Sequence, residues 1–194
     1  MSDIGVVEDV RWREVGERDK PAGFLKVRCR TYRYPNGNEA DWDILVGGNT
    51  VAVVALTADD QVVLVRQFRP GPGKVLLELP GGIAADGEAP AAAAARELLE
   101  ETGYEAETIE IVASTFLAAY ATHLRHAALA RGCRKTREPE PDEDEFAVTV
   151  TMPVPEFIRH VLGGQLTDMD MALAGLVAAK ILAPDASTTG ERMS

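Results

Sequence analysis

The most strongly predicted element of this 194-residue chain is a helix over residues 90–102, because both of its ends are marked. Pro90 suits the first helical position, where its missing N–H does no harm. The alanines at 91–95 are the best helix formers. Gly103 follows as a natural C-terminal stop. The chain must therefore fold around a helix whose second half reads RELLEETG.

Three glutamates in that half share one face of the helix. Glu97, Glu100 and Glu101 are three and four positions apart, and like charges at these spacings cost about 0.2–0.5 kcal/mol per pair. They also lie near the helix C-terminus, where the macrodipole disfavours anions. A solvated acidic face is the simplest interpretation of such a cluster. A bound hard cation such as Mg²⁺ or Mn²⁺, which prefers oxygen ligands and bridges carboxylates to phosphates, would turn the cost into a gain.

The residues around these three glutamates favour a bound cation over a solvated acidic face. From Gly82 to Tyr104 the chain fits G-x5-E-x7-R-E-U-x-E-E-x-G-U, where U is a bulky apolar residue, and Glu88 and Arg96 fill the second and third defined positions. With average residue usage, a chance match anywhere in the chain has odds on the order of 10⁻⁷ to 10⁻⁶. This stretch resembles the Nudix box, and the chain resembles a Nudix hydrolase.

The resemblance implies a fold and a set of site residues. The fold is α+β, an α/β/α sandwich around a mixed sheet, with the box forming a loop–helix–loop. The implied metal ligands are three carboxylates and one backbone carbonyl: Glu97, Glu100, Glu101 and Gly81. Metal ions there would polarise a phosphoryl oxygen and activate a water. Glu97, Glu101 and Arg96 are accordingly assigned to catalysis, Arg96 in a supporting part.

Three further residues of the box are expected to support the site. Arg96 should pair with Glu88, which would fix the loop before the helix and orient the glutamates. Gly82 should permit a close backbone approach or a positive φ. Gly103 ends the helix.

The segment before the box, VVLVRQFRPGPGKVLLELPGG (62–82), resembles the ADP-ribose pyrophosphatase branch of the family. On that resemblance Gln67, Arg69 and Glu78 are candidate substrate contacts, and the planar fork of Arg69 suits a phosphate. The competing interpretation makes Arg69 a surface residue and Glu78 a charge on an exposed strand face. Residues 116–123 contain no proline, whereas this branch usually carries one shortly after the box, so the preference for a sugar diphosphate stays open.

A catalytic base is sought in the acidic stretch that follows. In the branch that the chain resembles, a glutamate on a late acidic loop can activate water, and Glu143 and Glu145 are the candidates here. The competing interpretation makes each of them one charge of a solvated run over 132–145. His123 and His126 are alternatives.

The expected activity is Mg²⁺-dependent hydrolysis of a nucleoside diphosphate linked to another moiety, with ADP-ribose or a nucleotide sugar as the first expectation. Other Nudix substrates remain open: NADH, coenzyme A, a GDP-sugar or a damaged nucleotide. A nucleotide-binding regulator without turnover is the alternative from another class, but such proteins often lose box glutamates, and this chain keeps them all.

Charge and composition exclude several other classes. The net charge of −11 repels a phosphate backbone, so no nucleic-acid partner is expected. Cys29 and Cys133 have no CxxC spacing, which argues against a zinc site or a structural disulfide. The N-terminus lacks the pattern of a signal peptide, and the apolar stretch 171–179 is too short to span a bilayer. We expect a cytoplasmic protein without a membrane partner.

The strand and helix pattern, taken with the family resemblance, implies an N-terminal β segment (1–48), a Nudix domain (49–183) and a disordered tail (184–194). The β segment has β-like runs at 7–15 and 24–34, and a turn at 35–38 leads to a returning strand at 41–45. Later strands are expected near 51–56, 61–68, 75–79, 109–117, 126–131 and 146–152, and helices at 155–162 and 167–182. Because branch members often exchange such an N-terminal hairpin, a homodimer is expected.

Overall fold

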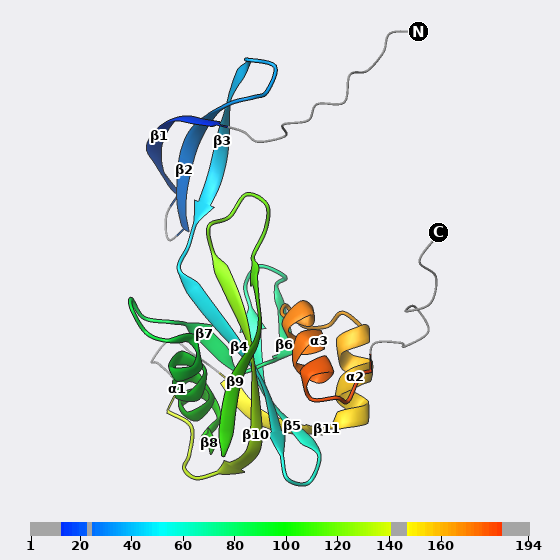
Figure 1. The fold of residues 1–194 in the computed structure, drawn as a ribbon. Coiled ribbons are helices and arrows are strands. Elements are labelled where there is room, and N and C mark those ends of the chain that lie inside the picture. Colours follow the sequence, from blue (N-terminus) through cyan, green and yellow to red (C-terminus); the bar gives the residue numbers. More distant parts are fainter. Residues whose placement is uncertain (1–12, 23–24, 141–146, 184–194) are drawn as a thin grey trace, which may run out of the picture. The chain divides into compact units, whose positions relative to one another are not determined.

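The computed structural model describes residues 13–22, 25–140 and 147–183 (Figure 1). The chain divides into two compact units, one made of residues 1–48 and 116–124 and the other of 49–115 and 125–194. The second unit begins at Asn49. The return of 116–124 to the N-terminal unit was not anticipated.

The first unit contains a three-stranded antiparallel sheet in the order β1-β2-β3, formed by β1 (Arg13–Ala22), β2 (Leu25–Arg33) and β3 (Glu39–Val46). The predicted hairpin is β2 and β3, joined by the expected turn, in which Gly37 has φ 86°. Of the strand expected at 7–15, residues 13–15 lie in β1, which continues to Ala22, and residues 7–12 lie outside the described residues. Segment 116–124 adds to this unit through a parallel bridge between Leu45 and Ala121.

The second unit is built on a mixed eight-stranded sheet with the central order β11-β5-β4-β10-β8. Its strands are β4 (Asn49–Thr57), β5 (Gln61–Arg69), β6 (Lys74–Glu78), β7 (Gly81–Ile83), β8 (Tyr104–Glu105), β9 (Thr108–Phe116), β10 (Leu124–Lys135) and β11 (Ala147–Pro153). β6 pairs with β5, β7 with β4 and β9 with β10.

Helices cover both faces of this sheet, which confirms the predicted α/β/α arrangement (Figure 1). The helix α1 (Pro90–Thr102) lies on one face, and α2 (Val154–Leu162) and α3 (Met169–Ala178) lie on the other. α1 has the predicted bounds, and Gly103 closes it in the left-handed conformation at φ 74°. α3 is shorter than the predicted 167–182.

The central strand β4 supplies both cores by alternation. Val51, Val53 and Ala55 pack toward the cluster that contains Ala93, Ala94 and Leu98 of α1. Ala52, Val54 and Leu56 belong to the other cluster, with Phe157 of α2 and Leu176 of α3. Period-two alternation in an apolar strand is what two buried faces require. α1 thereby packs against β4, and it also contacts β7, the strand that precedes it in the chain.

The prediction of a solvated acidic run over 132–145 is wrong in its first part. Residues 132–135 continue β10, and Arg134 and Lys135 pair with Glu105 and Tyr104 of β8. Residues 136–140 form a described loop, and 141–146 lie outside the described residues, as does the expected tail 184–194. Both cysteines are buried free thiols, and burial raises the pKa of Cys133 to about 11.

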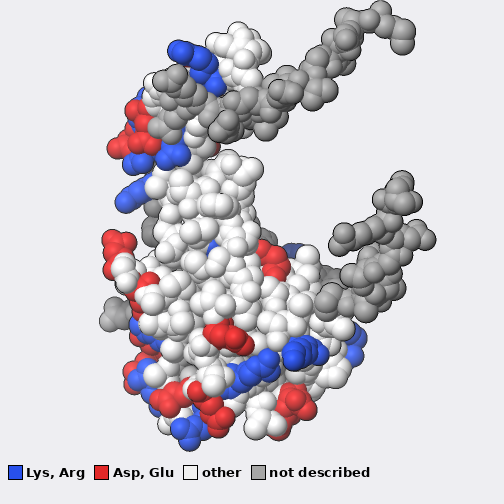
Figure 2. All heavy atoms as spheres, viewed as in Figure 1, with Lys and Arg blue, Asp and Glu red and all other residues white. Residues whose placement is uncertain are grey.

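Within the described residues no helix has the length and apolar character needed to cross a membrane. Acidic and basic side chains are interspersed over the second unit on the face that Figure 2 shows, without one continuous basic surface there.

Candidate active site

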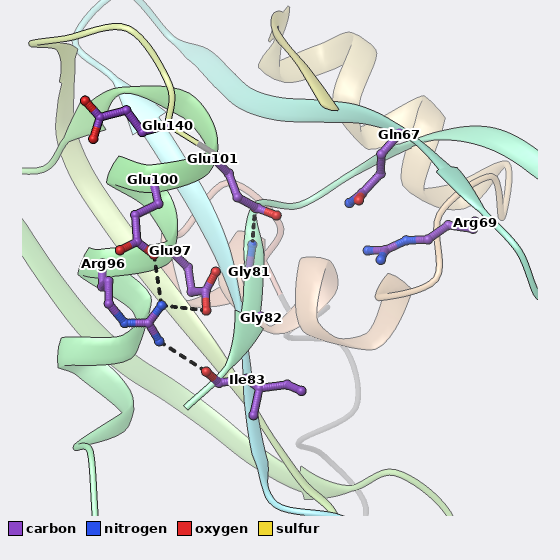
Figure 3. A pocket seen from close by; sticks show the side chains of 10 residues that line it. All are labelled: Gln67, Arg69, Gly81, Gly82, Ile83, Arg96, Glu97, Glu100, Glu101 and Glu140. Atoms are coloured by element: carbon purple, nitrogen blue, oxygen red, sulfur yellow. Dashed lines mark hydrogen bonds and ion pairs between the residues drawn. The ribbon is translucent and has the colours of Figure 1, made fainter. Parts of the chain in front are cut away.

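A pocket of about 360 Å³ lies in the second unit, against the acidic face of α1 (Figure 3). Carboxylates line one side of it, and an amide and a guanidinium from β5 line the other. The lining residues are Gln67, Arg69, Gly81, Gly82, Ile83, Arg96, Glu97, Glu100, Glu101 and Glu140. Four elements therefore converge: β5, β7, α1 and the loop after β10.

The three glutamates reach the pocket with different degrees of burial. Glu101 is 5% exposed, and its Oε2 accepts a hydrogen bond of 2.8 Å from the N–H of Gly81. The side chain of Glu97 is 13% exposed and that of Glu100 is 40% exposed. The three glutamates thus share one face of α1, as predicted, and their exposure to solvent increases from Glu101 through Glu97 to Glu100.

Arg96 links these carboxylates to the loop before the helix. Its Nη1 donates to Glu97 and to Glu100, each at 2.9 Å. Its Nε and Nη2 donate to the two carboxylate oxygens of Glu88, each at 3.0 Å, and Nη2 also donates to the carbonyl of Ile83. The Arg96–Glu88 pairing expected from the sequence is present in the structure.

The ion pair between Arg96 and Glu88 shifts the pKa of both residues. Hydrogen bonding to Glu88, and secondarily to the other two glutamates, raises the pKa of Arg96 above its ordinary value. The hydrogen bond from Arg96 and then the N–H of Ala85 lower the pKa of Glu88. Arg96 is consequently a permanent cation, and Glu88 remains ionised to lower pH than a free carboxyl.

Two glycines allow β7 to approach its neighbours closely, Gly82 toward α1 and Gly81 toward β4. A Cβ on Gly82 would lie 2.6–2.7 Å from the carboxylate atoms of Glu97, and one on Gly81 would lie 2.1 Å from the carbonyl oxygen of Val51. Of the two possibilities left open for Gly82, the structure has the close approach: its φ is not in the left-handed region.

The donor chemistry of the pocket fits a hard divalent cation. Carboxylate oxygens and backbone carbonyls are the ligands that Mg²⁺ prefers, and three carboxylates with a neighbouring glycine strand supply them. The described residues nevertheless contain no group of three acidic, histidine or cysteine side chains arranged around one point. Arg96 holds Glu97 and Glu100, and a cation would compete with it for their oxygens.

The candidate substrate contacts are divided by the structure. Gln67 and Arg69 line the pocket, opposite the glutamates. Glu78 is absent from the lining: it is fully buried and accepts hydrogen bonds from Thr167. The competing interpretation of Glu78 as a charge on an exposed strand face is wrong, because tertiary packing of the α2–α3 connection covers it.

Of the four candidate bases, the structure describes the two histidines. Glu143 and Glu145 lie outside the described residues. His126 is buried, with its Nδ1 2.7 Å from the hydroxyl of Ser114, and it does not line the pocket. His123 belongs to the first unit.

Two pocket residues were not anticipated. Glu140 comes from the same acidic run as the candidate bases, and its backbone N–H donates to the carbonyl of Glu100 at 2.7 Å. Ile83 follows the two glycines on β7. No local pattern distinguishes Glu140 from its acidic neighbours, since its position depends on where the loop meets α1.

Comparison with known proteins agrees with this geometry. The NUDIX domain model matches residues 46–170. The chain is 33% identical to an ADP-ribose pyrophosphatase of Mycobacterium tuberculosis (strain ATCC 25618 / H37Rv), over 86% of this chain and 79% of that protein. It is 30% identical to a methanol dehydrogenase activator of Bacillus methanolicus, over 77% of this chain and 82% of the relative.

The fold also agrees with a solved structure. A crystal structure of an ADP compounds hydrolase superposes with a TM-score of 0.76 at 19% identity, covering 89% of this chain and 94% of that one. At this identity the likeness concerns the fold. Together with the box on α1, these matches show that the chain belongs to the Nudix hydrolase family, in its ADP-ribose pyrophosphatase-like branch.

Proposed function

We propose that this enzyme hydrolyses a nucleoside diphosphate linked to another moiety, with ADP-ribose or a nucleotide sugar as its substrate and Mg²⁺ or Mn²⁺ as its cofactor. The observation that carries the proposal is the opposition of charges in one pocket: Glu97, Glu100 and Glu101 on one wall and Arg69 on the other. A diphosphate can lie between them, with a cation on the carboxylate side. The similarity to the ADP-ribose pyrophosphatase supports the substrate class.

Glu97, Glu100, Glu101 and the carbonyl of Gly81 would hold the cation. When bound, the cation supplies Lewis-acid polarisation of a phosphoryl oxygen and lowers the pKa of a coordinated water. Gln67 and Arg69 bind and orient the diphosphate, Arg69 through its planar donor fork. Arg96, anchored on Glu88, positions the carboxylates of Glu97 and Glu100.

The proton of the attacking water needs an acceptor. Glu143 and Glu145 remain the proposed bases on the acidic loop. Glu140 is a further candidate from the same loop, since it lines the pocket beside Glu100. Single substitutions to glutamine separate the three, because loss of the base lowers kcat with little change in KM.

The proposal is tested by incubating the enzyme with Mg²⁺ and a panel of ADP-ribose, ADP-glucose, GDP-mannose, NADH and coenzyme A, and by resolving the nucleotide products by chromatography. Release of AMP from ADP-ribose or ADP-glucose at the highest kcat/KM is the expected result. Preference for another member of the panel would reassign the substrate. Binding of these compounds without turnover would favour the alternative function, a nucleotide-binding regulator without hydrolytic activity.

We also propose a cytoplasmic homodimer with no nucleic-acid or membrane partner. The resemblance of the N-terminal β segment to exchanged hairpins supports it. Light scattering of the purified chain tests it, and a monomeric mass at micromolar concentration would refute it.

A further inference from the structure

Glu78 is a buried carboxylate that lies outside the pocket and has two kinds of partner. It ends β6, and none of its surface is exposed. Both of its carboxylate oxygens lie 3.1 Å from the backbone N–H of Thr167, and Oε2 also accepts a 2.7 Å hydrogen bond from the Thr167 hydroxyl. Burying a charge costs free energy unless the charge is paired or hydrogen-bonded, so the partners of Glu78 show what its carboxylate does.

The other partner is Arg69, which lines the pocket. Its Nη2 lies 3.7 Å from Oε2 of Glu78, a distance of charge attraction without a close hydrogen bond. The Nε of Arg69 is buried and has no hydrogen-bond partner among the described residues, while the side chain as a whole is 32% exposed. Arg69 is therefore attracted from one side by a fixed carboxylate and keeps donors unused.

Glu78 cannot follow Arg69 into the pocket because Thr167 holds it. Thr167 lies in the connection between α2 and α3, and the next residue, Asp168, pairs with Arg125 of β10. Arg125 is also paired with Asp170, at 3.0 Å. The connection is thus anchored twice, once on β6 through Glu78 and once on β10 through Arg125.

We propose that Glu78 is a positioning residue: held by Thr167, it fixes the guanidinium of Arg69 toward the diphosphate of the ligand. The assignment replaces the expected direct contact between Glu78 and substrate. It rests on the proposed function for the identity of the ligand. The chemical class that it serves is an anionic diphosphate.

Two conservative variants separate the effect of the Glu78 charge on Arg69 from the anchoring of the connection between α2 and α3. Glu78→Gln keeps the volume and retains an oxygen for the Thr167 N–H, but it removes the negative charge that attracts Arg69. Asp168→Asn weakens the other anchor of the same connection without touching Glu78. If Glu78 acts through Arg69, only the first variant impairs the ligand site.

The decisive experiment is a double-mutant cycle between Glu78→Gln and Arg69→Gln, with the Kd of ADP measured by titration calorimetry in Mg²⁺. Arg69→Gln is expected to weaken ADP binding about tenfold or more, and Glu78→Gln about fivefold. In the Arg69→Gln background, Glu78→Gln should have no further effect on Kd. Coupling of this kind identifies residues that act as one unit.

Additive effects in the cycle, or an equal loss of ADP binding in Asp168→Asn, would overturn the proposal in favour of simple loop anchoring. Failure of the wild-type protein to bind ADP would overturn it as well. Thermal unfolding of each variant shows whether it is folded. ADP binding is measured without turnover, so the cycle tests the role of Glu78 independently of hydrolysis. Absence of hydrolysis in the substrate panel would contradict the proposed reaction, and the double-mutant cycle would still decide how Glu78 acts.

Discussion

A Cβ placed on Gly82 would lie 2.6 Å from Cδ of Glu97, closer than real side chains approach each other. β7 and α1 thus meet at the carboxylate expected to bind the cation. Gly82→Ala would push Glu97 out of the pocket without disturbing the core. We predict that kcat/KM falls at least about tenfold, because the displaced carboxylate forfeits its part in the site, on the order of 1.4 kcal/mol or more.

The matched control is Gly71→Ala, which adds a methyl group to open space in the loop after β5 and should leave kcat/KM unchanged. Steady-state kinetics with the best substrate of the panel compares the two variants, and thermal unfolding checks that both are folded. Wild-type kinetics in Gly82→Ala would show that Glu97 has room to move and that its position is not critical.

Local signals were enough to predict α1 to the residue and the glutamates on its one face. Pro90 and Gly103 fix the ends of α1 by backbone chemistry alone. Strands β7 and β8 could not be predicted, since they are three and two residues long and exist through pairing with β4 and β10.

The opposite wall of the pocket is a tertiary feature. Spacing along the chain places Gln67 and Arg69 on one strand, but only the packed sheet sets them across from Glu101. The burial of Glu78 is similar: Thr167 is 89 residues away, and no local pattern connects them. Family resemblance pointed to the right strands, and three-dimensional packing decided which of their side chains reach the pocket.

Glu101 is the most buried of the pocket glutamates, and its carboxylate already contacts the backbone of β7. We predict that Glu101→Gln lowers Mg²⁺-dependent hydrolysis at least about a hundredfold while the protein stays folded, because the amide loses the charge that a cation requires. Glu110→Gln, on an exposed position of β9, is the control with unchanged activity. Substantial hydrolysis by Glu101→Gln would remove Glu101 from the set of metal ligands.

The lowered pKa of Glu88 makes part of the stability depend on pH. A carboxyl whose pKa is lower in the folded than in the unfolded state stabilises the protein above its unfolded pKa, and this stabilisation is lost as the pH falls through the folded value. We predict that Glu88→Gln unfolds at a lower temperature than the wild type at pH 7. The two melting temperatures should converge as the pH falls below the ordinary range of a glutamate.

The convergence is measured by thermal unfolding at closely spaced pH values from neutral to acid. Arg96→Gln removes the main cause of the lowered pKa and should lessen the pH dependence in the same range. A constant difference between wild type and Glu88→Gln at all pH values would indicate that the ionisation of Glu88 contributes nothing to stability.

Gly103 joins the end of α1 to the loop that carries Glu140. Its φ is 74°, and a Cβ there would lie 2.0 Å from the carbonyl oxygen of Arg137, whose own N–H donates to the carbonyl of Gly103. Gly103→Ala therefore combines a left-handed backbone with a steric clash. The left-handed backbone conformation alone costs about 1–2 kcal/mol for a residue other than glycine. Gly164→Ala, with φ 65° and open space around its Cβ, measures this backbone cost without the clash.

We predict a clearly lower free energy of unfolding for Gly103→Ala than for Gly164→Ala in urea titrations, together with a loss of hydrolysis as Glu140 and the C-terminal turn of α1 separate. Equal destabilisation of the two variants would mean that the loop yields to the added methyl group and that its contact with α1 is not fixed.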